Sequence, residues 1–133
     1  MPTDAFDIYT TVFKKGTGTF MARIVGADGT LLDRGAIASI TYSVYLLNDR
    51  DPNARQAMIG HENITLNVAD VLFNALQTDV VWIHDRIGYN FRHVLDVSAH
   101  AAFPMAGRRY LVEYCLLPAV GQPILVRFRV NVI

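Results

Sequence analysis

The sequence predicts an all-β protein: a two-sheet antiparallel β-sandwich of immunoglobulin-like character with one short helix. Apolar and polar residues alternate with a period of two in several segments, and turn-forming residues separate these segments, which gives about seven short strands. The chain of 133 residues has the size of one domain. A domain of this size buries about two thirds of the surface of its unfolded chain. A small closed β-barrel is the alternative, because it has the same strand pattern.

Two strands are predicted in the first third of the chain. Residues 18–25 alternate between apolar residues on one face and mixed residues on the other, which is typical of a strand. An Asp-Gly turn at 28–29 follows it. Residues 38–47 alternate β-branched and aromatic side chains in the pattern of a half-buried strand.

The middle of the chain changes its period. Residues 48–53 are polar and rich in turn formers, so they predict an exposed loop, with a short strand near 56–59 after it. Apolar residues then repeat every four positions over 68–76, which predicts a short helix that crosses between the sheets. Asn67 is placed to cap this helix, and Asp70 lies in its first turn, where the helix dipole favours a carboxylate.

The last part of the chain predicts more strands and a closing hairpin. Residues 80–83 read as a strand, followed by a turn at Gly88 and a strand through residue 97. The hairpin covers 108–133. Pairing residue 116 with 124 and residue 110 with 130 places the apolar sets of both arms on one side, and leaves a three-residue loop at 119–121 with Gly121 at a positive φ.

The hairpin register also pairs two charges and completes the core. Glu113 faces Arg127 as an exposed cross-strand pair worth a few tenths of a kcal/mol. The predicted core consists of the inward residues of four strands: Phe20, Ile24, Tyr42, Val44, Tyr110, Val112, Val126 and Phe128.

Composition favours protein association over nucleic-acid binding. Twelve Lys and Arg residues balance twelve Asp and Glu residues, so no basic excess exists to neutralise phosphates. Charged residues make up 18% of the chain and hydrophobic residues 52%. Because little repulsion separates copies of such a domain, we expect it to associate with copies of itself. A monomer with a large core is the alternative.

The residues that could carry chemistry do not form a recognised motif. His61 and His84 each precede a carboxylate, and His93 and His100 follow, but none of them has the spacing of a zinc site. The single cysteine, Cys115, lies in a strand where a buried free thiol is the usual outcome. No nucleophile elbow or phosphate-binding loop is present. We therefore expect no enzyme activity, no cofactor and no metal.

The N-terminal segment is predicted to be an interface rather than a targeting signal. Its acidic residues do not fit a signal peptide, and no apolar run is long enough to span a membrane, so we expect no membrane partner. Residues 1–17 are expected to form an arm that lies on a neighbouring copy, while residues 18–133 form the sandwich; pairing of this segment within its own domain is the alternative. The candidate interface residues are Phe6, Ile8, Tyr9, Val12 and Phe13.

A sugar-binding shelf is a weaker prediction. Trp82, Tyr89 and Phe91 surround the turn at Gly88, and aromatic faces at the end of a sandwich can stack on ligands. The alternative is that Trp82 belongs to the core, which fits its apolar neighbours in 80–83.

Three segments resemble immunoglobulin-like virion domains of tailed bacteriophages: TFMARIVGADGTLL at 19–32, ITYSVY at 40–45 and RYLVEY at 109–114. The order of strand, Asp-Gly turn, strand and final hairpin is similar to that of the N-terminal domain of baseplate upper proteins. The resemblance covers residues 18–133, with a departure at 68–76. It implies a structural subunit of the virion, in a tail, baseplate, neck or capsid decoration, whose partners are its own copies and other virion proteins. The alternative is a carbohydrate-binding or adhesin module, in the cytoplasm or at a cell surface.

Overall fold

A computed structural model of the chain describes residues 4–25, 30, 32–48, 50–51, 54–78 and 88–133. The side chains of residues 4–7 are outside this description.

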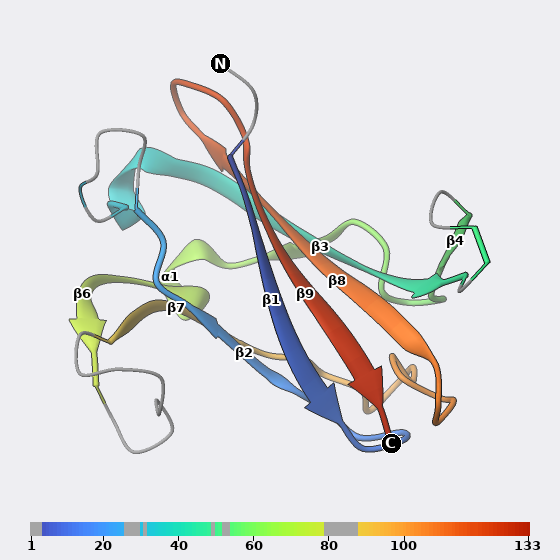
Figure 1. The fold of residues 1–133 in the computed structure, drawn as a ribbon. Coiled ribbons are helices and arrows are strands. Elements are labelled where there is room, and N and C mark those ends of the chain that lie inside the picture. The colour runs from blue at the N-terminus through green and yellow to red at the C-terminus, as the bar shows by residue number, and fades with distance from the viewer. Residues whose placement is uncertain (1–3, 26–29, 31, 49, 52–53, 79–87) are drawn as a thin grey trace.

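The described strands form two sheets (Figure 1). The larger sheet has six strands: β1 (Asp4–Val12), β9 (Ile124–Val132), β8 (Arg109–Pro118), β3 (Ile37–Leu47) and β4 (Arg55–Ala57) in this order, with β5 (Ile64–Leu66) also paired to β3. The smaller sheet has three: β2 (Thr19–Ala22), β7 (Tyr89–Val94) and β6 (Leu72–Gln77). A 3₁₀ turn, η1 (Arg34–Ala36), precedes β3, and the helix α1 (Val68–Val71) links β5 to β6. The fold is the predicted all-β two-sheet sandwich and not the barrel.

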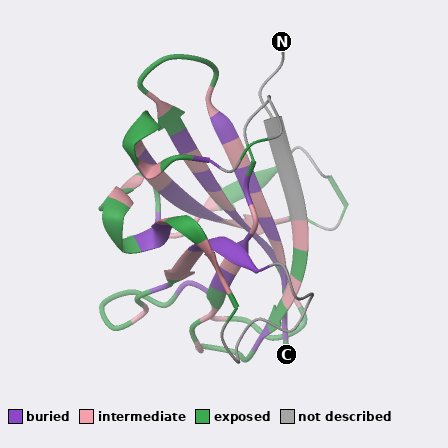
Figure 2. Ribbon diagram, turned by 90° about the vertical axis from the view of Figure 1, so that its left-hand side faces the viewer, coloured by how far each residue is buried: buried purple, intermediate pink, exposed green. Residues whose placement is uncertain are grey.

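The core lies between the two sheets. All eight residues predicted for it are buried. Phe20 of the smaller sheet meets Phe128 of the larger sheet edge to face, with ring centroids 5.0 Å apart. Figure 2 shows buried and less buried residues alternating along the strands of the larger sheet, as expected when one face packs inward.

The closing hairpin has the predicted register. Tyr110 pairs with Val130, Leu116 pairs with Ile124, and Gly121 has a φ of 118°. The predicted loop is too short, because β8 ends at Pro118 and β9 begins only at Ile124. The end of β8 continues its pairing with β3 instead of turning at once into β9.

The predicted helix over 68–76 is mostly wrong. Only α1, Val68–Val71, is helical, and residues 72–77 form strand β6. Asn67 caps α1 as predicted, since its side-chain oxygen accepts a hydrogen bond from the Ala69 amide at 3.1 Å. Leu72 ends the helix because it pairs with Phe91 of β7, a tertiary contact that overrides the local period.

The N-terminal segment differs from the expected arm. β1 pairs in parallel with β9 of its own chain through nine residue pairs, from Asp4 with Ile124 to Val12 with Val132. Residues of β1 that face the core pair with residues of β9 that also face the core. Ile8 and Val12 therefore lie on the apolar face of the sheet. The segment is therefore the edge strand of the sandwich, which was the alternative.

Gly88, the residue of the predicted turn, comes directly before β7, and the residues that precede it lie outside the described ones. Gly88 has a φ of 107°, and a Cβ at this position would lie 2.3 Å from the carbonyl oxygen of Gln77. Only glycine fits this backbone. β7 ends at Val94 rather than at residue 97. The predicted strand at 80–83 and the predicted turn at 28–29 lie outside the described residues.

Candidate protein interface

The outer face of the larger sheet carries one continuous row of side chains. The strand register aligns Tyr9 of β1 with Arg129 of β9, then with Leu111 of β8, Tyr45 of β3 and Ala57 of β4. Partners in adjacent strands point to the same side of a sheet, so these five residues cross it together. We call this set the outer row.

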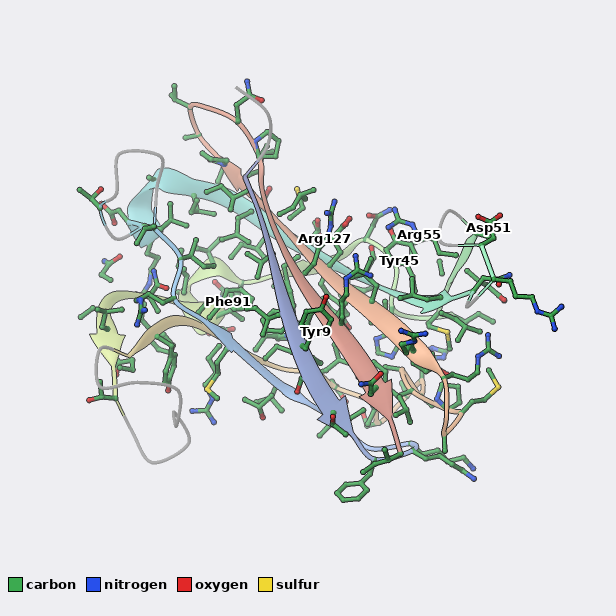
Figure 3. All side chains as sticks on the ribbon, in the orientation of Figure 1. Tyr9, Tyr45, Asp51, Arg55, Phe91 and Arg127 are labelled. Carbon is green, nitrogen blue, oxygen red and sulfur yellow. The ribbon has the colours of Figure 1, made fainter. Side chains whose placement is uncertain are left out.

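Arginine and tyrosine recur on this face. The guanidinium of Arg55 lies 4.0 Å from the ring centroid of Tyr45, a cation–π contact. Arg127 donates from Nε to Glu113 at 2.9 Å, which confirms the predicted cross-strand pair, although both side chains are half-buried rather than exposed. Figure 3 labels Tyr9, Tyr45, Arg55 and Arg127 along this face, on four different strands. Tyrosine and arginine are the side chains enriched at the centres of protein interfaces.

An apolar residue lies beneath these long side chains. Leu111 is only 4% exposed although its parity in β8 places it on the outer face, away from the central core. Its neighbours in the outer row therefore already exclude water from part of this face.

Among the strands that the structure describes, none pairs with the outer side of β1. β1 is the outermost described strand of this sheet and is nine residues long. Its sequence DAFDIYTTV contains no Lys or Pro, and its charged residues, Asp4 and Asp7, lie in its first half. Tyr9 is 75% exposed, and Phe13, just after the strand, is 74% exposed. An extended segment of another chain could add to this edge through main-chain hydrogen bonds.

Of the five predicted interface residues, two are exposed and two face the core. Tyr9 and Phe13 are exposed, as an interface requires. Ile8 and Val12 face the core, so they stabilise the sandwich itself, which corrects their assignment. Phe6 aligns with the inward-facing Val126, but its side chain is outside the description.

Tyr45, Arg55, Leu111 and Arg129 were not singled out from the sequence. Their outward orientation could be predicted from the sequence, because residues that alternate with the inward residues of a strand must point outward. What was missing was the order of the strands.

The predicted sugar shelf is not formed by the residues that the structure describes. Tyr89 is 1% exposed and Phe91 is 0% exposed. The ring of Phe91 packs edge to face on Tyr114 at 4.8 Å, and Tyr89 packs on Phe73. Both are therefore core residues, which corrects their assignment as ligand contacts. Trp82 lies outside the described residues.

Two histidines take part in hydrogen bonds inside the sandwich. His61 faces the carbonyl of His100 with Nε2 at 2.7 Å, so Nε2 donates, and Nδ1 accepts from the Tyr42 hydroxyl at 2.9 Å. His93 Nδ1 lies 2.7 Å from the Tyr114 hydroxyl. Burial lowers the pKa of His93 to about 4, so its ring is neutral at pH 7 and shares a hydrogen bond with that hydroxyl. Both histidines thus provide hydrogen-bond partners for the hydroxyl groups of buried tyrosines.

The remaining reactive groups are also in structural surroundings. Cys115 is a free thiol, half-buried rather than buried as expected, because its parity in β8 places it on the outer face. Burial and the nearby Glu113 raise the pKa of this thiol, which disfavours the reactive thiolate. Among the described residues, no three His, Cys, Asp or Glu side chains are grouped to hold a metal ion.

The hollows in the described surface are open and small. One, of about 380 Å³, lies between the β4–β5 connection and residues 99–101, and is lined by Met58, Ile59 and His100 among others. It contains no carboxylate and no nucleophile. In the described part of the chain no helix has the length and apolar character needed to cross a bilayer.

Comparison with known proteins gives no assignment. No family model, no curated protein and no solved structure matches this chain.

Proposed function

We propose that this chain is a non-enzymatic structural subunit of a phage-like virion that works through protein–protein contacts. The supporting observation is the continuous outer row from Tyr9 to Ala57, bordered by the open edge of β1. This combination places tyrosine and arginine side chains next to a strand able to extend the sheet. The virion setting, in a tail, baseplate, neck or capsid decoration, rests on the sequence resemblance alone.

Charge and residue choice support an assembly function. The chain has zero formal net charge, so its copies do not repel each other strongly. Ten of its twelve basic residues are arginine and only two are lysine. Arginine suits protein interfaces because its planar, weakly hydrated guanidinium makes bidentate and stacking contacts. The carbohydrate-binding alternative has no support among the described residues, because Tyr89 and Phe91 are core residues.

The test is the mass of the protein in solution across the micromolar range, with matched variants. Tyr9→Lys places a charge on the exposed edge strand, and Val120→Lys makes a similar change at an exposed hairpin tip. We expect wild type and Val120→Lys to associate, and Tyr9→Lys to weaken association at least tenfold. A wild-type protein that stays monomeric and binds no other virion protein would contradict the proposal.

The virion setting needs a separate measurement. In purified phage particles that carry this chain, quantitative mass spectrometry should give a fixed copy number per particle. A variable or trace amount would identify it as a contaminant rather than a structural component.

A further inference from the structure

We propose that β1 exchanges between two copies of this chain, so that β1 of each copy pairs with β9 of the other. This inference rests on the proposed function, because it names the contact through which copies associate. The occupant follows from the structure, since the site beside β9 holds β1 and a second copy supplies an identical segment.

β1 is attached in a way that permits exchange. Among the described strands its ladder joins β9 alone, at the edge of the larger sheet. After Val12 the chain leaves this sheet and enters β2 of the smaller sheet. Withdrawing β1 therefore breaks one ladder and leaves the β9–β8–β3 pairing and the smaller sheet in place.

The connection after β1 is a short turn under backbone strain. The Gly16 amide donates to the Phe13 carbonyl at 2.8 Å, which closes the turn. Within it Lys15 has a φ of 60°, in the left-handed region that costs a residue with a Cβ about 1–2 kcal/mol. An extended connection would return Lys15 to an ordinary negative φ. Short strained connections of this kind favour domain swapping.

The balance of contacts depends on this connection. Exchange restores the β1–β9 ladder and the core contacts of Ile8 and Val12, because each β9 receives an identical strand. It removes two hydrogen bonds of the closed form in each chain: the bond from the Lys15 amide to the Phe103 carbonyl and the turn bond from the Gly16 amide to the Phe13 carbonyl, each 2.8 Å long. In return, the exchange removes the backbone strain at both Lys15 residues of the dimer. It also brings the two exposed Phe13 side chains to the place where the two connections cross between the copies.

A disulfide between β1 and β9 tests the exchange directly. Thr11 and Asn131 are exposed partners in the ladder, so a Thr11→Cys/Asn131→Cys variant in a Cys115→Ser background can form one bridge per β1–β9 pair. After oxidation of the isolated dimer, exchange predicts chains linked to each other on a denaturing gel. A dimer whose bridges are all within single chains would overturn the exchange and leave the proposed assembly function intact.

A second pair of variants tests the strain without new cysteines. Lys15→Gly removes the strain at the turn, and we expect it to weaken dimerisation about 30-fold, which corresponds to about 2 kcal/mol for two turns. Asn63→Gly is the matched control, because Asn63 also has a positive φ, 52°, but lies outside the connection. An unchanged dimerisation constant in Lys15→Gly, or an equal change in Asn63→Gly, would overturn the inference. A wild type without any dimer at high protein concentration would overturn it as well.

Discussion

Asn90 joins β2 and β7 beyond the end of their backbone ladder, and its removal should weaken the sandwich strongly. The ladder ends at the pair of Ala22 and Phe91. Beyond it, the Ile24 amide donates to Asn90 Oδ1 at 2.7 Å, and Asn90 Nδ2 donates to the Ile24 carbonyl at 2.9 Å. Asn90 and Ile24 are both 0% exposed, so the side-chain amide takes the place of a paired strand residue.

The magnitude follows from the one backbone group that loses its only partner. Asn90→Ala leaves the Ile24 amide buried without a hydrogen bond, at about 1–3 kcal/mol, whereas the Ile24 carbonyl keeps the bond that it accepts from the Leu32 amide at 3.2 Å. We expect a loss of about 2 kcal/mol in the free energy of unfolding and a melting temperature lower by about 7 °C. Urea denaturation measures the first quantity, and hydrogen exchange at the Ile24 amide reports the bond itself.

A surface asparagine provides the control. Asn74 accepts one hydrogen bond from the Arg34 amide at 2.7 Å in an exposed position, so Asn74→Ala should cost no more than about 1 kcal/mol, because water replaces the lost partner. If Asn90→Ala unfolds within about 1 kcal/mol of wild type and with the same denaturant slope, the reasoning about buried backbone groups is refuted.

Three further predictions concern pH, backbone and core. The folded pKa of His93, about 4, lies below its ordinary value of 6.5, so its contribution to stability is complete above pH 6.5 and is lost as pH falls from 6.5 towards 4. Discounted for partial exposure of the ring, we expect about 2 kcal/mol in urea titrations, and a His93→Gln variant that loses the same amount over this range would contradict the assignment. Gly88→Ala should cost at least about 2 kcal/mol, because φ is positive and the Gln77 carbonyl leaves no room; a smaller loss would show that the turn can relax. Phe128→Ala should cost about 3–5 kcal/mol and the exposed Val120→Ala less than about 0.5, and similar losses would contradict the core assignment.

The candidate interface was only partly visible in the sequence. Tyr9 and Phe13 were predicted as interface residues and are exposed, whereas Ile8 and Val12 turned out to face the core. The difference arises because strand-like composition does not say which face of the strand is covered. Parallel pairing with β9 settles it, and this contact joins the two ends of the sequence.

Local patterns alone determined the parts of the fold that depend on nearby residues. The period-two alternation in 110–116 and 124–130 is sufficient to set the hairpin register, because a shift by one residue would turn every apolar side chain outward. The Asn67 cap and the positive φ at Gly121 follow in the same way from the chemistry of single residues.

Tertiary structure alone decided where distant segments meet. Residues 72–77 have a helical apolar period, but pairing of Leu72 with Phe91 makes them a strand. Tyr9 and Tyr45 belong to one surface only because β9 and β8 lie between their strands. Strand order is set by contacts between residues far apart in the sequence, whose energies no local window contains. For this reason the sequence predicts the strands and the core of this protein, while its outer surface comes from their assembly.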